Sequence, residues 1–413
     1  MTPAAASQAS KSKLATSRWK VVFALLLLLC TFVFCYFTFV CSPYKRWRHF
    51  TLTPPQLSQR TRLMSRHGGP LNGSFYMPAN MHRGPPPLDY KFDMNGSDVV
   101  VFLHMQKTSG TVFGRHLVHH MDLDEPCQCT EGTKRCRCLR PQTTNKHWLF
   151  SRFSTGWKCG LHADWTELST CVDDVMNTKV EGSIASRRYF YVTILREPMS
   201  RLISEFRHVR RGATWNKSRH MCNGRYPTAD ELPPCYKTDV WEDVTLDAFL
   251  ACESNLAFNR QTRMLADLRL VGCYDRDAMT TDERDGVMLA SAKHNLDNLA
   301  FFGLAEQQEL TQFLFQQTFK LRFTVVFAQA DSSKSANTPV THAQSERIRS
   351  RNVLDVELYR HAERVFAARV AAMTAQFPAE YERFVKEVNG ESEMEFPDGG
   401  SFAKMSHRTK SGH

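Results

Sequence analysis

One stretch decides the expected fold: Val99-Val-Val-Phe-Leu-His-Met-Gln-Lys-Thr-Ser-Gly-Thr-Val-Phe-Gly114. Its first five residues form an uninterrupted apolar run, which is typical of a strand buried in a parallel sheet. Helical periodicity follows from Val112 to about His120. The residues between strand and helix therefore form a loop in which backbone N–H groups and a helix N-terminus can hold an anion.

This loop also carries a cation and several hydroxyl groups. Lys107 supplies the charge, and the hydroxyl donors are Thr108, Ser109 and Thr111. The Walker pattern G-x-x-x-x-G-K-[ST] is absent, because Lys107 precedes Gly110 instead of following it. Spacing alone leaves two interpretations open: an anion-binding loop, or a helix cap rich in threonine and serine beside a solvated lysine.

The order of strand and helix returns further along the chain. An apolar run from Tyr189 to Leu195 predicts a second buried strand, and Pro198 stands where a helix could begin. The pattern continues with a short strand at 300–303 and helices over about 243–267, 286–299, 306–319 and 343–385. Strands that alternate with helices predict an α/β fold whose central, mostly parallel sheet is flanked by helices.

An uncharged apolar segment from Val21 to Cys41 precedes the expected domain. Its length matches the roughly 20 residues that cross a bilayer, so we predict a transmembrane helix over 21–41 behind a cytoplasmic tail of residues 1–20. A cleaved signal peptide is the alternative, but its apolar core is shorter, about 7–15 residues, and small residues follow it. Here Pro43, Tyr44 and Lys45 follow, which favours an uncleaved signal anchor.

The residues after this segment have features of a lumenal protein. Ten of the thirteen cysteines lie between Cys127 and Cys273, an even number that suits disulfide bonds in an oxidising compartment. We therefore predict a single-pass type II protein with a lumenal bulk, although basic residues flank the span on both sides. Zinc binding is the alternative for the two C-x-C pairs, whose spacing differs from the usual C-x₂-C. N-glycosylation sequons begin at Asn72, Asn95 and Asn216.

Composition predicts how the rest of the chain is organised. Residues 42–97 are rich in proline, arginine, methionine and asparagine and indicate a lumenal stem. The folded domain is expected over 98–386, and residues 387–413, poor in apolar side chains, indicate a disordered tail. The formal net charge of +11 favours a polyanionic partner, but charge alone does not choose among nucleic acid, an anionic membrane and an acidic polysaccharide.

Two motifs resemble the donor-binding elements of the Golgi carbohydrate sulfotransferases. The stretch 101–111 is similar to their 5′-phosphosulfate loop, and Ile194-Leu-Arg-Glu-Pro-Met-Ser-Arg201 is similar to their 3′-phosphate motif. The resemblance implies a P-loop-like sulfotransferase fold and 3′-phosphoadenylyl sulfate (PAPS) as the donor. An arginine fork suits a dianionic phosphate, and the helix start would add its dipole. The implied donor-binding residues of these motifs are His104, Met105, Gln106, Lys107, Thr108, Ser109, Gly110, Thr111, Val112, Arg196 and Ser204.

Longer strings resemble one family within this group, the heparan-sulfate 6-O-sulfotransferases. They are Phe150–Trp165, Phe206–Trp215 and Asn259–Leu268, and the similarity covers about 99–335. It implies sulfuryl transfer to the 6-hydroxyl of glucosamine in heparan sulfate, on the Golgi membrane, with no nucleic acid as partner. The oligomeric state, the disulfide pairing, cleavage of the stem and the preferred uronic-acid context stay open.

The resemblance also assigns roles to single residues. It implies that His162 is the general base, that Lys107 neutralises charge on the leaving group, and that transfer is direct and in line. It implies no metal, because a sulfuryl group carries less negative charge than a terminal phosphoryl group. For the residues expected to bind the acceptor, the alternatives are that the charged ones are solvated loop residues and that the tryptophans belong to the core. The implied acceptor-binding residues are Lys134, Arg135, Arg152, Trp157, His162, His208 and Trp215.

A later segment resembles the part of the family that closes over the nucleotide, but it departs from the family pattern. Lys334 stands where the family tends to have arginine, and Ala330 stands where it often has an aromatic residue. In the first loop, Ser109 replaces a common glycine, and its effect stays open. The implied nucleotide contacts in the later segment are Phe327, Ala328, Gln329, Ser333 and Lys334.

Two other functions fit part of the sequence. A membrane-anchored nucleotide kinase would need a Walker lysine and a Mg²⁺ carboxylate, and no convincing pair is found. A heparan-binding receptor without activity would explain the positive charge and the anchor. It would not require Arg196, Ser204 and the loop at 104–114 together. We therefore predict an enzyme.

Overall fold

The computed structural model describes residues 75–78, 80–213, 219–238, 240–327 and 339–390. These residues belong to one structural unit, which begins at Leu71. The predicted transmembrane segment 21–41 and the expected tail after residue 390 lie outside them. Among the described helices, none combines the length and apolar character that crossing a bilayer requires.

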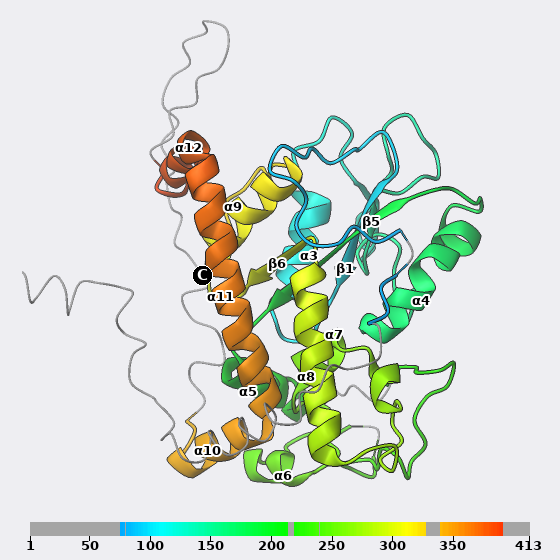
Figure 1. Ribbon diagram of the computed structural model, residues 1–413, viewed down its shortest axis with the longest axis vertical. Coiled ribbons are helices and arrows are strands. Elements are labelled where there is room, and N and C mark those ends of the chain that lie inside the picture. Colours follow the sequence, from blue (N-terminus) through cyan, green and yellow to red (C-terminus); the bar gives the residue numbers. More distant parts are fainter. Residues whose placement is uncertain (1–74, 79, 214–218, 239, 328–338, 391–413) are drawn as a thin grey trace, which may run out of the picture. The chain divides into compact units, whose positions relative to one another are not determined.

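A parallel four-stranded sheet forms the centre of the unit, as Figure 1 shows. Its strands in spatial order are β4 (Leu149–Phe150), β1 (Asp98–Leu103), β5 (Arg188–Leu195) and β6 (Phe301–Leu304). Every residue of β1 is buried, because neighbours cover both of its faces. The predicted parallel sheet and its strands at 99–103, 189–195 and 300–303 are confirmed.

Helices flank this sheet, as the alternating pattern predicts. The long helix α11 runs along α8 and contacts β6 (Figure 1). The single helical pattern expected over 343–385 is divided into three helices, with breaks at Asn352 and at Phe377. The second break has a local cause, because Pro378 lacks the N–H that would continue a helix and starts a new one instead. The helices are α3 (Gly110–His119), α4 (Trp165–Val175), α5 (Pro198–Arg210), α6 (Leu246–Ala251), α7 (Arg260–Leu265), α8 (Thr281–Asn298), α9 (Gln308–Phe319), α10 (His342–Arg351), α11 (Val353–Gln376) and α12 (Pro378–Val388).

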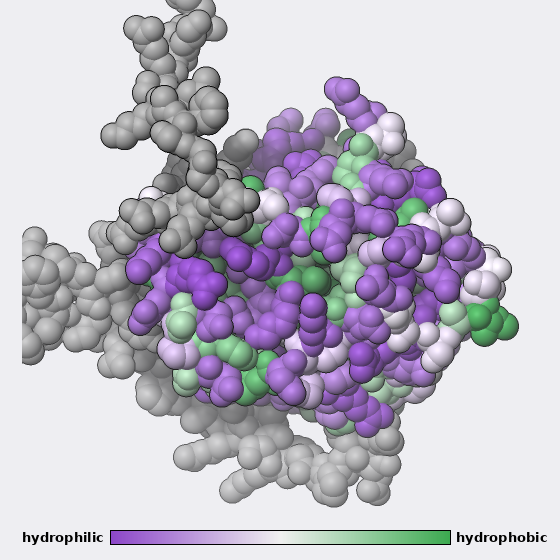
Figure 2. Space-filling view, turned by 90° about the horizontal axis from the view of Figure 1, so that it is seen from above, coloured by the Kyte–Doolittle hydropathy of each residue, from purple (hydrophilic) through white to green (hydrophobic). Residues whose placement is uncertain are grey.

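Aromatic packing fixes α3, which follows the anion-binding loop, against the sheet. The ring of Phe113 lies 6.0 Å from that of Phe301 in β6 and 5.6 Å from that of Phe315 in α9. All three side chains are buried, so moving α3 away from the sheet would expose large apolar surfaces to water. Hydrophilic side chains cover most of the coloured face in Figure 2, and apolar ones appear in small groups.

Residues 75–97, which fall in the region expected to be a stem, pack against the domain. The backbone N–H of His82 donates to the carbonyl of Tyr189 at 2.9 Å, and that of Phe92 donates to the carbonyl of Phe319 at 3.0 Å. Phe92 is 3% exposed. The composition of this segment resembles that of a linker, but these two anchors attach it to the sheet and to α9.

All ten cysteines between 127 and 273 form disulfide bonds, which confirms the prediction of disulfides. Two of the bonds are nested around the hairpin of β2 (Gln128–Cys129) and β3 (Cys136–Arg137). The zinc alternative for the C-x-C pairs is wrong, because each of their sulfur atoms is bonded to another sulfur. The bonds are Cys127–Cys138, Cys129–Cys136, Cys159–Cys171, Cys222–Cys273 and Cys235–Cys252.

Candidate active site

The loop between β1 and α3 is sharply curved because two of its residues adopt left-handed backbone conformations. Lys107 has φ 67° and Ser109 has φ 66°. Alternating backbone handedness turns successive N–H groups toward a common centre, where an anion can bind. Ser109 forms no side-chain cap on α3, so its hydroxyl does not occupy the first-turn N–H groups of that helix.

Glycine would adopt the conformation of position 109 more easily than the serine found there. A side chain in the left-handed region costs about 1–2 kcal/mol, and glycine avoids that cost. Ser109 is therefore a strained residue of this loop. Gly110 is required for another reason: a Cβ atom there would lie 2.5 Å from Cδ2 of His104.

Buried polar atoms without partners mark this loop as a binding site. Within the described part of the chain, both polar atoms of the Gln106 side chain and Nδ1 of His104 are buried without a hydrogen bond. Gln106 is 1% exposed. Such groups are rare in folded proteins, and a ligand bound at the loop is one way to complete their hydrogen bonding. The loop therefore fits a phosphorylated donor.

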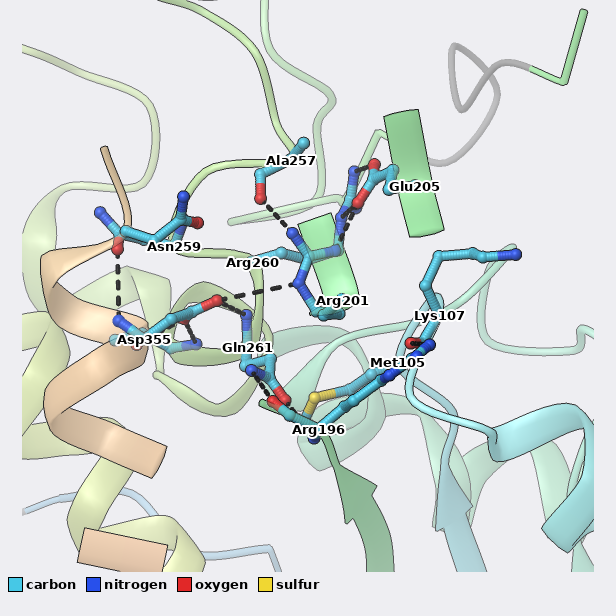
Figure 3. A network of polar contacts seen from close by, with 12 residues as sticks. Met105, Lys107, Arg196, Arg201, Glu205, Ala257, Asn259, Arg260, Gln261 and Asp355 are labelled. Atoms are coloured by element: carbon cyan, nitrogen blue, oxygen red, sulfur yellow. Dashed lines mark hydrogen bonds and ion pairs between the residues drawn. The ribbon is translucent and has the colours of Figure 1, made fainter. Parts of the chain in front are cut away.

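The arginine of the second motif reaches this loop. Nη1 of Arg196 donates to the carbonyl of Lys107 at 3.3 Å, although 89 residues separate them in sequence (Figure 3). Gln261 holds the backbone of Arg196 from both sides, accepting from its N–H at 2.9 Å and donating to its carbonyl at 2.8 Å. Burial, as the first cause, lowers the pKa of Lys107, and the charge of Arg211 lowers that pKa further. This concentration of cations suits a polyanionic ligand.

A buried ionic network supports that arrangement (Figure 3). The carboxylate of Glu205 in α5 accepts from Arg201 at 2.5 Å and from Arg260 in α7 at 2.5 and 3.0 Å. All three side chains are at most 1% exposed. Burial alone would raise the pKa of Glu205, but Arg260 and Arg201 outweigh it and lower that pKa to about 2. The network binds α5 to α7, which carries Gln261.

One expectation about α5 needs correction. The first turn of this helix was expected to offer its dipole to a phosphate. Instead, the carboxylate of Glu197 accepts from the N–H groups of Met199 at 2.9 Å and Ser200 at 2.7 Å. A carboxylate cap satisfies this terminus internally. Any 3′-phosphate selectivity must therefore come from side chains such as that of Arg196.

His162 lies on the other side of the same loop. Its Nδ1 is 3.1 Å from the carbonyl of His104. A carbonyl can only accept, so Nδ1 of His162 carries the hydrogen and the basic lone pair lies on Nε2. His162 is 5% exposed, and burial, as the first cause, lowers its pKa to about 3. The imidazole is therefore neutral at physiological pH and can accept a proton.

Several expected acceptor-binding residues gather beside His162. The Trp157 ring lies 4.5 Å from the His162 ring, and the guanidinium of Arg152 lies 5.0 Å from the centre of a Trp157 ring. Arg135 is adjacent, since its Cδ lies 3.2 Å from where a Cβ of Gly156 would be. A pocket lies against this group and is lined in part by Phe102, His104, Arg152, Trp157 and Ala163.

Comparison with known proteins agrees with this geometry. Residues 90–362 match the model of the sulfotransferase family. Over 281 residues the chain is 54% identical to heparan-sulfate 6-O-sulfotransferase 3-B of Danio rerio, which covers 68% of this chain and 67% of that protein. The chain belongs to the heparan-sulfate 6-O-sulfotransferase family. It is 52% identical over 280 residues to heparan-sulfate 6-O-sulfotransferase 3 of Homo sapiens, with 67% of this chain and 59% of that protein covered. The match to heparan-sulfate 6-O-sulfotransferase 2 of Gallus gallus is 51% identical over 283 residues, with 68% and 70% covered.

The remaining predicted residues of this 6-O-sulfotransferase fall into two groups. Lys134 is exposed, Ser204 and His208 are half-buried in α5, and Phe327 is 1% exposed at the end of a described segment. Burial is the first cause that lowers the pKa of His208, and the positive charge of Lys107 is the second. The two residues are therefore neighbours. The predicted residues that lie outside the described part are Asn72, Trp215, Asn216, Ala328, Gln329, Ser333 and Lys334.

Sequence reasoning missed a buried cluster behind the imidazole of this sulfotransferase. Nδ1 of His220 lies 2.9 Å from Glu167, whose other carboxylate oxygen accepts from the N–H of Met221 at 2.8 Å. Glu167 also forms a capping box with Asp164, which is two residues from His162. Burial, as the first cause, raises the pKa of Asp164 to about 7, although the charge of His220 opposes this. The capping-box spacing was the only signal available in the sequence.

Proposed function

We propose that this chain transfers a sulfuryl group from PAPS to the 6-hydroxyl of glucosamine residues in heparan sulfate. The observation that carries the proposal is the convergence of Arg196 and His162 on one loop, where they bond to the carbonyls of Lys107 and His104. The names of the relatives support the acceptor, since each is called a heparan-sulfate 6-O-sulfotransferase. The chain spans 59–70% of the length of these relatives.

On the donor side, the residues of the first loop and Arg196 would hold PAPS, which supplies the sulfuryl group when bound. The N–H groups around Lys107 and Ser109 would bind anionic oxygens, and the unpartnered Gln106 amide would add a donor and an acceptor. The ammonium of Lys107 would neutralise negative charge that develops on the leaving oxygen. Phe327 would lie at the start of the nucleotide-covering segment. We further propose that neither donor binding nor sulfuryl transfer requires a metal ion.

On the acceptor side, His162 would take the proton of the sugar hydroxyl on Nε2. The hydrogen bond from Nδ1 to the carbonyl of His104 keeps this lone pair on Nε2 and orients the ring. The pKa of His162 in the free protein is about 3, so its imidazole is already neutral at physiological pH and needs no deprotonation before it accepts the proton of the hydroxyl. Bound sulfate and carboxylate groups would stabilise the resulting imidazolium. The cations that would pair with them include Lys134, Arg135 and Arg152.

The test combines labelled donor with desulfated heparan. We expect [³⁵S]sulfate to pass from labelled PAPS to the 6-position of glucosamine without added metal, as disaccharide analysis would report. We expect His162→Ala to lose about 10²–10⁴-fold in turnover while PAPS binding persists, because only the base is removed. His342→Ala, which changes an exposed histidine at the start of α10, is the matched control. Near-normal turnover of His162→Ala would remove this residue from its role, and label at another position would overturn the proposed acceptor.

We also propose a type II topology in the Golgi membrane, with the tail at 1–20, the anchor at 21–41 and the sulfotransferase domain at 98–386 in the lumen. Five disulfide bonds support an oxidising compartment. Asn95 is exposed and thus accessible to glycosylation, which we propose for it and for Asn72 and Asn216. Protease added to sealed vesicles should leave the domain intact, and its digestion would refute this topology.

A further inference from the structure

Two histidines near the end of α3 face each other outside the site described above. Nδ1 of His116 lies 2.9 Å from Nδ1 of His120, and both side chains are half-buried. The i, i+4 spacing puts the two rings on one face of the helix. We propose that this pair is a chelating site for a divalent first-row transition-metal ion, for which Zn²⁺ is the probe.

The distance between the two nitrogens matches the requirement of such an ion. Imidazole nitrogens bind Zn²⁺ at about 2.0–2.1 Å, so two of them lie about 2.9–3.4 Å apart for angles of 90–109° at the metal. The observed 2.9 Å is within that interval, so the rings need little movement. Imidazole ligands suit Zn²⁺, Cu²⁺ and Ni²⁺, whereas Mg²⁺ and Ca²⁺ prefer oxygen. Water would complete the coordination on the exposed side.

The surroundings hold the His116 ring and the backbone of His120 in position before an ion arrives. The His116 ring stacks on Phe327 with 4.1 Å between ring centres and an angle of 24°. The carbonyl of His120 accepts from the N–H of Thr324 at 2.8 Å, which fixes the end of the helix. Burial and the neighbouring His120 lower the pKa of His116 to about 4. One of the two Nδ1 atoms carries the hydrogen of their contact, so an ion that bonds to both atoms would move that hydrogen to Nε2 of the same ring.

Two other groups of potential ligands are weaker candidates. His119 lies near Cys129 and Cys136, but these cysteines are bonded to each other and offer no thiolate. Asp164, Glu167 and His220 also lie together. The oxygens of Glu167 are already occupied by three N–H donors, which a metal would have to displace.

The test is a titration of the full chain, first freed of metal with EDTA and then exposed to ZnCl₂ in a calorimeter. We expect the unchanged chain and His119→Gln to bind one equivalent at this site. His120→Gln should bind it at least about tenfold more weakly, because one imidazole remains. His119 is the matched control, since it is exposed and lies one residue away on the same helix.

A second measurement locates the ion. Because the His116 ring packs on Phe327, Zn²⁺ should slow hydrogen exchange at 116–120 and at 323–327 in the unchanged chain and not in His120→Gln. Melting temperatures in EDTA verify that each variant is folded, and His120→Asn replaces the glutamine variant if that one is unfolded. Equal affinity in His120→Gln, or no saturable binding by the unchanged chain, would overturn the proposal. Neither readout depends on sulfuryl transfer, so this proposal and the proposed function can fail separately.

Discussion

Replacing Glu205 with glutamine tests the buried ionic network that supports Arg196. The substitution keeps the shape of the side chain but leaves the cations of Arg201 and Arg260 without their shared carboxylate. The lowered pKa of Glu205, about 2 against a usual 4.5, corresponds to about 3 kcal/mol of stabilisation at neutral pH. Breaking a buried pair costs about 3–5 kcal/mol in general, in agreement with that figure.

The assay is thermal unfolding at pH 7 with intact disulfides. With an unfolding entropy of about 2 cal/mol/K per residue over roughly 300 residues, that loss lowers Tm by about 5–8 °C. The control is Glu231→Gln, because the pKa of Glu231 is also lowered to about 2 but its partner Arg225 is 54% exposed. Solvent screens that pair, so Tm should hardly change. Equal shifts in the two variants would refute the reasoning from burial.

The sign of the pH dependence supplies an independent check on Glu205. Its pKa is lower in the folded chain than in the unfolded one, so the unfolded chain binds the proton first as the pH falls. The stabilisation is therefore complete above about pH 4.5 and disappears as the pH falls through about 2. The difference in Tm between the unchanged chain and Glu205→Gln should shrink across this interval. A difference that stays constant would contradict an ionic origin.

Three further predictions concern the candidate active site. The pKa of His162 is lowered to about 3, so its protonation should not reduce kcat/KM between pH 8 and 5. The contribution of His162 to the stability of the fold should fall as the pH drops from 6.5 toward 3, because the unfolded chain binds the proton first. A decrease in kcat/KM near pH 6.5 that is absent from His162→Gln would contradict this. Ser109→Gly should raise the free energy of unfolding by about 1 kcal/mol, because glycine relieves the left-handed backbone strain at this position. Thermal unfolding measures this, and an unchanged Tm would show that Ser109 does not strain the loop. Lys134→Ala combined with Arg135→Ala should raise the acceptor KM, most strongly at low salt, where the contacts of these two cations are screened least. An unchanged KM would refute their role.

The parts of the fold that were predicted from sequence are those encoded locally. The apolar run at 99–103 has one favourable arrangement, a fully buried strand, and the structure buries all of β1. The helix after it is encoded by periodicity, and its start is observed at Gly110. His162 was different, because sixteen histidines have no local feature that separates a base from the rest. Its role as the base is a prediction from the resemblance, and its orientation by the carbonyl of His104 became visible only in three dimensions.

Long-range contacts account for what could not be predicted. Phe92 belongs to a segment with the composition of a linker, yet it is buried, and its N–H bonds to the carbonyl of a residue more than two hundred positions away, Phe319. The pairing of Glu205 with Arg260 likewise joins residues 55 apart. In each case the sequence specifies the side chain but not the partner, because loop closure between distant segments depends on the whole fold.

The curvature of the first loop connects these observations to the proposed chemistry. Lys107 and Ser109 adopt left-handed backbone conformations, and that curvature turns the carbonyl of Lys107 toward Arg196. On the other side, the carbonyl of His104 holds the imidazole of His162. In the proposed function, the same short loop is therefore bonded to both the cation that would hold a phosphate and the base that would take the proton of the hydroxyl. A strained loop of this kind costs stability. The buried Glu205 network joins α5 to α7, and Gln261 of α7 holds the backbone of the arginine that contacts this loop, Arg196.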